Sequence, residues 1–166
     1  MSIGSTTELF EHMLRDMLYA EHKNLKCITD YIDKADDAEL RDSFRAHFME
    51  TERQIERLEL VFDLCDFDLR TEKCEALNGI IDEGKHMCMS SLPGPVRDAA
   101  MIVAAQKILH YEICSYGTLC EFANTLGLSE VARILGDSLA EEKSFDAMLT
   151  RIAESGINVR ATLAAA

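Results

Sequence analysis

The segment Val96–Leu126 (VRDAAMIVAAQKILHYEICSYGTLCEFANTL) decides the fold of this protein. It carries apolar residues on nearly every face of a helix and holds no proline, which is typical of a long and largely buried helix. Ser90–Pro95 (SSLPGP) precedes it, and Pro95 suits a first helical turn. Gly127 follows in the position of a C-terminal cap. The sequence therefore predicts a buried helix that begins and ends at these residues.

Three further long stretches repeat apolar residues with the period of an amphipathic helix. They run from Ser5 to about Ile32, from a cap at Asp36 or Asp37 to about Cys65, and from Ser129 to Gly156. A shorter segment, roughly Thr71–Met89, lies between the second and third long helices. This pattern predicts an all-α, ferritin-like four-helix bundle with a short additional helix in the crossover. We expect residues 1–155 to form this single domain and residues 156–166 to form a frayed tail.

Composition limits the function classes. The chain has 166 residues and a formal net charge of −13, so nucleic acid and anionic membrane surfaces are disfavoured as partners. No apolar run approaches the ~20 residues of a membrane span, and the N-terminus does not resemble a signal peptide. The six cysteines include no CxxC pair, and Cys114 and Cys120 lie too far apart along one helix for a disulfide. We expect reduced thiols and a cytoplasmic protein.

Polar residues interrupt the apolar faces of all four long helices. Glu21 and Glu142 fall within the apolar stripes of the first and last helices. On the second helix, His47, Glu50 and Gln54 share one face. The segment 96–126 carries a further polar set, which consists of Gln106, His110, Glu112 and Tyr116.

Buried carboxylates from several helices repel one another unless a cation lies between them. Oxygen ligands with one or two imidazoles suit iron or manganese better than a thiolate zinc site. Each residue also has a simpler interpretation. A single Glu can lie at the margin of its stripe and reach water, and a single His47 can be a hydrogen-bonded core residue. The residues alone leave both interpretations open.

Several motifs resemble those of the YciF-type family of ferritin-like stress proteins. The resemblance covers about residues 6–153. It rests on Leu9-Phe10, Asp16, Ala20-Glu21, His47-x-x-Glu50-Thr51-x-x-Gln54-Ile55-Glu56-Arg57-Leu58, Lys73-Cys74-x-Ala76, Gly79-Ile80-Ile81-x-Glu83, Val96-Arg97-Asp98-Ala99-Ala100, Ala105-Gln106, His110-Tyr111-Glu112-Ile113, Tyr116-Gly117-Thr118-Leu119 and Leu139-x-Glu141-Glu142-Lys143.

The resemblance implies a homodimer with a dinuclear iron or manganese centre. It makes four carboxylates the metal ligands, namely Glu21, Glu50, Glu112 and Glu142. It adds His47 as the nitrogen ligand and Gln54 and His110 as direct or supporting ligands. Asp146 lies four residues beyond Glu142, as Gln54 lies four beyond Glu50, and is a further candidate.

The chain departs from the family at two positions. Family members usually carry a glutamate immediately before the His-Tyr-Glu stretch, where this chain has Leu109. They often carry a tyrosine where this chain has Leu18, with Tyr19 beside it. The loss of a carboxylate at position 109 leaves open whether one metal, two or none is bound.

Two functions follow as hypotheses. The first is a metal-binding protein of the stress response that reduces oxygen or peroxide, with Tyr19, Tyr111 or Tyr116 as an electron donor. The second is a non-catalytic structural or partner-binding bundle whose metal site is partly lost, and Leu109 favours it. Whether there is enzymatic turnover is left open by the sequence.

Overall fold

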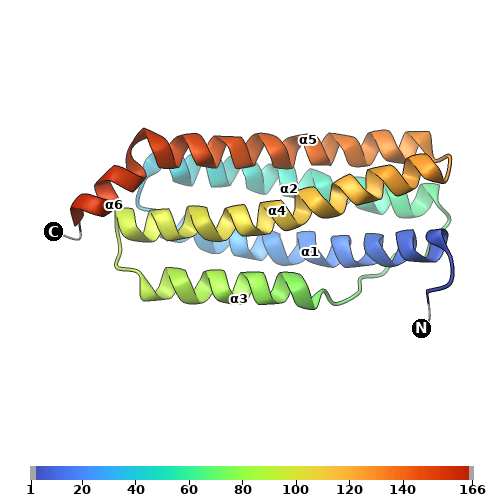
Figure 1. The fold of residues 1–166 in the computed structure, drawn as a ribbon, viewed down its shortest axis with the longest axis horizontal. Coiled ribbons are helices and arrows are strands. Elements are labelled where there is room, and N and C mark those ends of the chain that lie inside the picture. Colours follow the sequence, from blue (N-terminus) through green and yellow to red (C-terminus); the bar gives the residue numbers. More distant parts are fainter. Residues whose placement is uncertain (1–2, 165–166) are drawn as a thin grey trace.

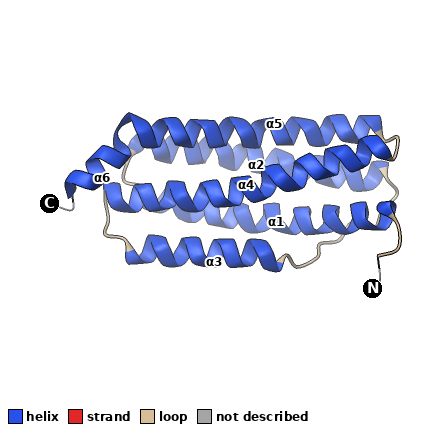
Figure 2. Ribbon diagram, viewed as in Figure 1, coloured by secondary structure: helices blue, strands red, loops and turns tan. Residues whose placement is uncertain are grey.

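The computed structural model describes residues 3–164, and in this range the chain forms helices and no strands (Figure 2). Four helices are long: α1 (Thr6–Lys34), α2 (Ala38–Leu64), α4 (Pro95–Thr125) and α5 (Ser129–Ile152). The shorter α3 (Glu75–Ser90) lies in the crossover between α2 and α4. The all-α class and the short crossover helix are confirmed.

The four long helices form a ring in which each packs against two others. Helix α1 contacts α2 and α4, and α5 contacts the same two helices from the opposite corner. Neighbours in this ring run antiparallel, and α3 returns along the outside of the bundle against α4 (Figure 1). This is the ferritin-like arrangement that the sequence predicts. It places one face of each long helix in a shared interior.

The helix ends follow from local chemistry. The Ser5 hydroxyl accepts a hydrogen bond from the Glu8 backbone N–H, and an Asp37 carboxylate oxygen accepts one from Leu40. Pro95 is the first residue of α4, where its missing N–H costs nothing. Gly127 takes the left-handed backbone conformation, with φ of 77°, directly after α4. The predicted boundaries at Pro95 and Gly127 are confirmed.

Helix α3 approaches α4 closely through a glycine. A Cβ atom built on Gly84 would lie 2.8 Å from the Cβ of Ala104, so a larger residue would force these helices apart. The apolar face of α3, with Leu77 and Ile81, closes over the outside of the bundle. The core therefore extends beyond the four-helix interior. No helix within residues 3–164 is both long and apolar enough to cross a bilayer.

The C-terminal segment differs from the expectation. A π-helical turn at Ala153–Ile157 contains the kink at Gly156, and α6 (Asn158–Ala164) follows it. Ile157 is buried, and α6 packs against α4. The segment expected as a frayed tail, residues 156–166, thus contains a helix that contacts α4, and the kink at Gly156 sets its direction. Residues 165 and 166 lie outside the described part of the chain.

Candidate metal centre

Three glutamates from three helices lie fully buried in the bundle interior. Glu21 comes from α1, Glu112 from α4 and Glu142 from α5, and each is 0% exposed. Each occupies a position where helical periodicity otherwise places an apolar core residue. We call these three residues the carboxylate cluster. Carboxylates of like charge in one dry interior repel one another and lack the solvation that water would give them.

Each glutamate of the cluster accepts hydrogen bonds from a neutral side chain on another helix. The Tyr116 hydroxyl donates to Glu21 Oε1 at 2.5 Å, Asn24 Nδ2 donates to the two oxygens of Glu112 at 3.1 and 3.2 Å, and Gln54 Nε2 donates to Glu142 Oε1 at 2.6 Å. These donors carry no positive charge. They orient the carboxyl groups without neutralising them.

Several buried polar atoms at the cluster have no hydrogen-bond partner within residues 3–164. They are Glu21 Oε2, Glu142 Oε2, His47 Nε2 and Gln54 Oε1. His47 Nε2 lies 4.0 Å from Glu142 Oε2, beyond hydrogen-bonding distance. The His47 ring stacks on Phe145, with 3.9 Å between the ring centroids, so its orientation is fixed by packing. An unpartnered polar atom in a dry interior is costly, and here several lie together.

Burial raises the pKa of all three glutamates above the usual range. For Glu21 the charge of Glu142 adds to the effect, and for Glu112 the charges of Glu21 and Glu142 do so. For Glu142 the nearby His47 opposes the rise. The side-chain contact between Glu112 and Glu142 raises the pKa of Glu112 further and opposes the rise in the pKa of Glu142. In the absence of a cation, the cluster therefore retains protons at pH values where exposed glutamates have lost them.

An outer layer of charged residues borders the cluster. Arg57 donates two hydrogen bonds to Glu141, at 2.6 and 2.8 Å, and so neutralises the acid next to Glu142. Glu50 Oε2 lies 3.5 Å from His47 Nδ1, and this contact with His47 lowers the pKa of Glu50. A carboxylate on Nδ1 orients the imidazole and leaves Nε2 directed at Glu142.

Five of the eight predicted ligands come together in the interior. These are Glu21, His47, Gln54, Glu112 and Glu142. Glu50 lies at the edge, in contact with His47 through Nδ1.

The other two predicted ligands form a separate pair outside the cluster. His110 Nε2 lies 3.4 Å from Asp146 Oδ1, and the His110 side chain is 69% exposed. His110 precedes Glu112 by two residues, which turns it about 200° away around α4. Asp146 also accepts a hydrogen bond from Gln106 at 3.1 Å. The structure therefore does not bring His110 or Asp146 to the buried glutamates.

Sequence reasoning missed one contributor to the cluster. Asn24 is buried and bonds both oxygens of Glu112. Its position three residues after Glu21 places it on the same face of α1, and that spacing could have indicated it. Among the three candidate tyrosines, Tyr116 contacts the cluster, while Tyr19 donates to Asn78 and Tyr111 to Asp16.

Two features of the donor set bear on whether it fits a metal ion. Carboxylate oxygens and one imidazole suit iron or manganese, and the unpartnered atoms of Glu21, Glu142 and His47 are available as ligands. Against this, no three His, Cys, Asp or Glu side chains in the described range are placed so that they could hold a metal ion as they stand. The chemistry fits a metal, but the side chains must rearrange to bind one.

Leu109, where a family glutamate was expected from the sequence, faces the same interior. It is buried and lines a cavity of about 10 Å³ together with Asn24 and His47. A cavity of this size holds at most about one water molecule. A glutamate at this position would therefore reach the same interior as His47.

The fold and the buried glutamates define a helical-bundle protein of the ferritin-like class with a carboxylate-lined interior. The chain belongs to the family described as Domain of unknown function (DUF892), whose model matches residues 5–162. Protein YciF of Escherichia coli (strain K12) is 36% identical over 162 residues, which is 97% of this chain and 98% of that protein.

Solved structures agree with this assignment. The crystal structure of the E. coli stress protein YciF superposes with a TM-score of 0.88 at 36% identity, and covers 94% of this chain and 99% of that one. YcfI of Rhodopseudomonas palustris gives a TM-score of 0.87 at 35% identity, over 90% of this chain and 95% of that one. A Xanthomonas campestris protein at 21% identity shares the fold, with a TM-score of 0.75 over 96% of both chains.

Proposed function

We propose that this protein binds iron or manganese at the carboxylate cluster and uses the metal in a stress response. The related E. coli protein is described as a stress protein, which supports the biological setting. Glu21, Glu112, Glu142 and His47 would hold the metal. Gln54 would support Glu142, to which it already donates a hydrogen bond.

One observation supports this proposal: the buried interior holds unpartnered polar atoms from three helices. Glu21 Oε2, Glu142 Oε2 and His47 Nε2 are buried without hydrogen-bond partners in the described chain. Three glutamates in one dry core destabilise the fold unless they are protonated or neutralised by a cation. A divalent cation neutralises two charges at once and accepts lone pairs from oxygen and nitrogen alike.

The residues around the cluster have separate roles in this proposal. When bound, iron or manganese would supply the chemistry for reducing oxygen or peroxide. The Tyr116 hydroxyl donates to Glu21, so Tyr116 is the tyrosine placed to deliver a proton or an electron there. Phe145 packs on His47 and excludes water from that side. Asn24 and Gln54 orient Glu112 and Glu142 through their hydrogen bonds.

A second candidate function is a structural or partner-binding bundle whose metal site is partly lost. It is favoured by Leu109 and by the absence, within residues 3–164, of three ligands already placed for a metal. The relative YcfI is described as a candidate structural protein. In this case protons on the glutamates would replace the cation permanently.

Metal content and thermal melting separate these two functions. Untagged protein purified with iron and manganese available should carry about one or two metal ions per chain by plasma mass spectrometry. A chelator should lower the melting temperature, because a metal at 100 times its Kd adds about 2.7 kcal/mol. The double variant E21Q/E142Q should lose both the metal and the chelator effect.

The matched control is E130Q, which removes a surface carboxylate of α5. It should keep the metal content and the chelator effect of the wild type. A wild-type protein that holds no metal after reconstitution, and melts at the same temperature with and without chelator, would support the structural bundle instead. Metal-dependent peroxide consumption, compared between wild type and E21Q/E142Q, then tests the chemistry. The homodimer and the cytoplasmic location stay predictions, the first of which light scattering can test.

A further inference from the structure

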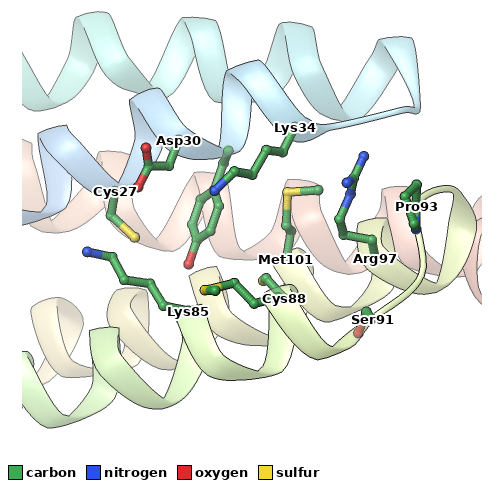
Figure 3. A pocket seen from close by; sticks show the side chains of 11 residues that line it. Cys27, Asp30, Lys34, Lys85, Cys88, Ser91, Pro93, Arg97 and Met101 are labelled. Carbon is green, nitrogen blue, oxygen red and sulfur yellow. The ribbon is translucent and has the colours of Figure 1, made fainter.

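A cavity of about 450 Å³ lies between α1, α3 and the beginning of α4, apart from the carboxylate cluster. Figure 3 shows side chains from these three helices and from the loop before α4 around it. Its volume is within the ~300–1,000 Å³ of typical small-molecule sites. None of the predicted metal ligands lines this cavity, so it requires its own explanation.

The charge of the lining is opposite to the charge of the protein. Three basic residues, Lys34, Lys85 and Arg97, line the cavity against one acid, Asp30. The whole chain has 17 Lys and Arg against 30 Asp and Glu. A local excess of positive charge on such an acidic chain favours an anion in the cavity.

The lining also offers hydrogen-bond donors that have no acceptor in the described chain. The Tyr31 hydroxyl and Arg97 Nε are buried without a hydrogen-bond partner, and the Tyr31 hydroxyl has only the Cys27 thiol, a weak acceptor, beside it. Lys34 and Lys85 make no ion pair or side-chain hydrogen bond within residues 3–164, and Figure 3 shows both reaching toward the cavity from α1 and α3. Arg97 is partly engaged, because its Nη2 donates to Asp36 at 2.8 Å. An oxyanion would accept from the donors that remain.

The rest of the lining is apolar. Met101 is completely buried, and the thiols of Cys27 and Cys88 lie in the cavity wall with the Tyr31 ring. Burial raises the pKa of both thiols, so they stay protonated and contribute uncharged surface to the cavity. The neighbouring helices are held in place by the close approach of Gly84 to Ala104. A ligand therefore needs an apolar body as well as a negative group.

We propose that this cavity is a binding site for a small amphipathic carboxylate, a molecule with one negative group and a short apolar body. The carboxylate lies between Lys34 and Lys85 and accepts from the Tyr31 hydroxyl. The apolar body packs against Met101 and the two thiols. The site is independent of the proposed metal centre.

Isothermal titration with three eight-carbon probes tests the proposal. Octanoate should bind saturably at one site per chain, while octanol and octylamine should bind at least about tenfold more weakly. The double variant K34Q/K85Q should weaken octanoate binding about five- to tenfold, since it removes two exposed charges that attract the carboxylate. Y31F should weaken it about threefold, because it removes one neutral donor. The control K26Q/K143Q removes two exposed charges outside the cavity and should bind octanoate like the wild type.

Thiol labelling locates the site. Octanoate should slow the alkylation of Cys88 by iodoacetamide, read by peptide mass spectrometry, and leave exposed Cys114 unaffected. The proposal is overturned if octanoate does not bind saturably, if octylamine binds equally well, if K34Q/K85Q binds like the control, or if Cys88 is not protected. All of these variants change partly or fully exposed side chains or remove a single hydroxyl, and their melting temperatures verify folding.

Discussion

Two regions of this protein bury acidic side chains and treat them in opposite ways. At the corner where α1 turns into α2, the two oxygens of Asp98 each accept a backbone N–H, from Asp36 and from Asp37, both at 2.9 Å. Asp36 in turn accepts from the Gly94 N–H and from Arg97, at 2.6 and 2.8 Å. In the carboxylate cluster, the donors are neutral side chains, and two carboxylate oxygens have no partner in the described chain.

The difference separates a structural use of carboxylates from a functional one. At the corner, backbone and guanidinium donors compensate the acids, so Asp98 ties the start of α4 to the α1–α2 turn. In the cluster, burial raises the pKa of each glutamate, as it does for Asp98, but no backbone N–H, Lys or Arg of the described residues bonds these glutamates. The acids of the corner have all the hydrogen-bond donors that they need within the protein. The glutamates of the cluster need a proton or a cation in addition.

Placing a fourth carboxylate in the cluster should have the largest effect. In metal-free protein, L109E should destabilise the fold by about 3 kcal/mol, because it replaces a buried leucine with an acid beside unpaired acids. Saturating Mn²⁺ should recover a large part of this loss and raise the metal content per chain. Urea unfolding with and without the metal measures both effects.

The matched control for this change is L109Q, which has a similar size and no charge. It should be destabilised without recovery by Mn²⁺. Equal recovery in L109E and L109Q, or none in L109E, would contradict a metal site at the cluster.

Removing an acid from the corner should cost about 2 kcal/mol. In D98N, one oxygen is replaced by an NH₂ group that faces a backbone N–H, so one buried donor of the α1–α2 turn loses its acceptor. Urea unfolding measures this loss. D137N, which alters an exposed Arg133–Asp137 pair of α5, should change stability by less than ~0.5 kcal/mol. A D98N protein as stable as D137N would show that the corner bonds contribute little.

The same acid-to-amide change in the cluster should act in the opposite direction. With chelator present near neutral pH, E112Q should gain about 1 kcal/mol, because an amide is neutral in the dry interior without having to take up a proton, and its oxygen still accepts from Asn24. With metal present, the variant should lose the stabilisation that the wild type gains. Thermal melting in the two conditions measures this reversal. If E112Q were destabilised as strongly as D98N, the carboxylates of the cluster would stabilise the fold as those of the corner do, and the contrast between the two regions would be wrong.

The fold was predictable because its signals are local. The 3.6-residue period places the helices, and Pro95 and Gly127 act on their own backbone wherever the chain packs. Helix α6 was missed because a glycine such as Gly156 usually indicates the end of a helix. The burial of Ile157 depends on contacts with distant parts of the chain, which the local sequence does not show.

The residues of the site were predictable only where helical periodicity determines which side chains are buried. Glu21 and Glu142 fall in the centre of apolar stripes and are buried as expected. His110 was assigned by resemblance, although its rotation of about 200° from Glu112 points it to the surface. Asn24 was missed because an asparagine carries no charge whose burial would have needed explanation. The partners of a polar residue depend on which helices meet, which the sequence pattern alone does not specify.

The smallest predicted effect lies at the outer edge of the corner, where Arg160 of α6 donates to Asp37 at 2.6 Å. Arg160 is half exposed, so R160Q should cost no more than ~1 kcal/mol, and amide hydrogen exchange should quicken in residues 158–164. In 1 M salt the difference between R160Q and the wild type should nearly vanish, because the Debye length falls to about 3 Å. The E112Q effect should persist in the same salt, since the cluster is fully buried. If high salt removed both effects equally, solvent ions would be reaching the glutamates. The cluster would then not be the dry interior on which its proposed affinity for a metal depends.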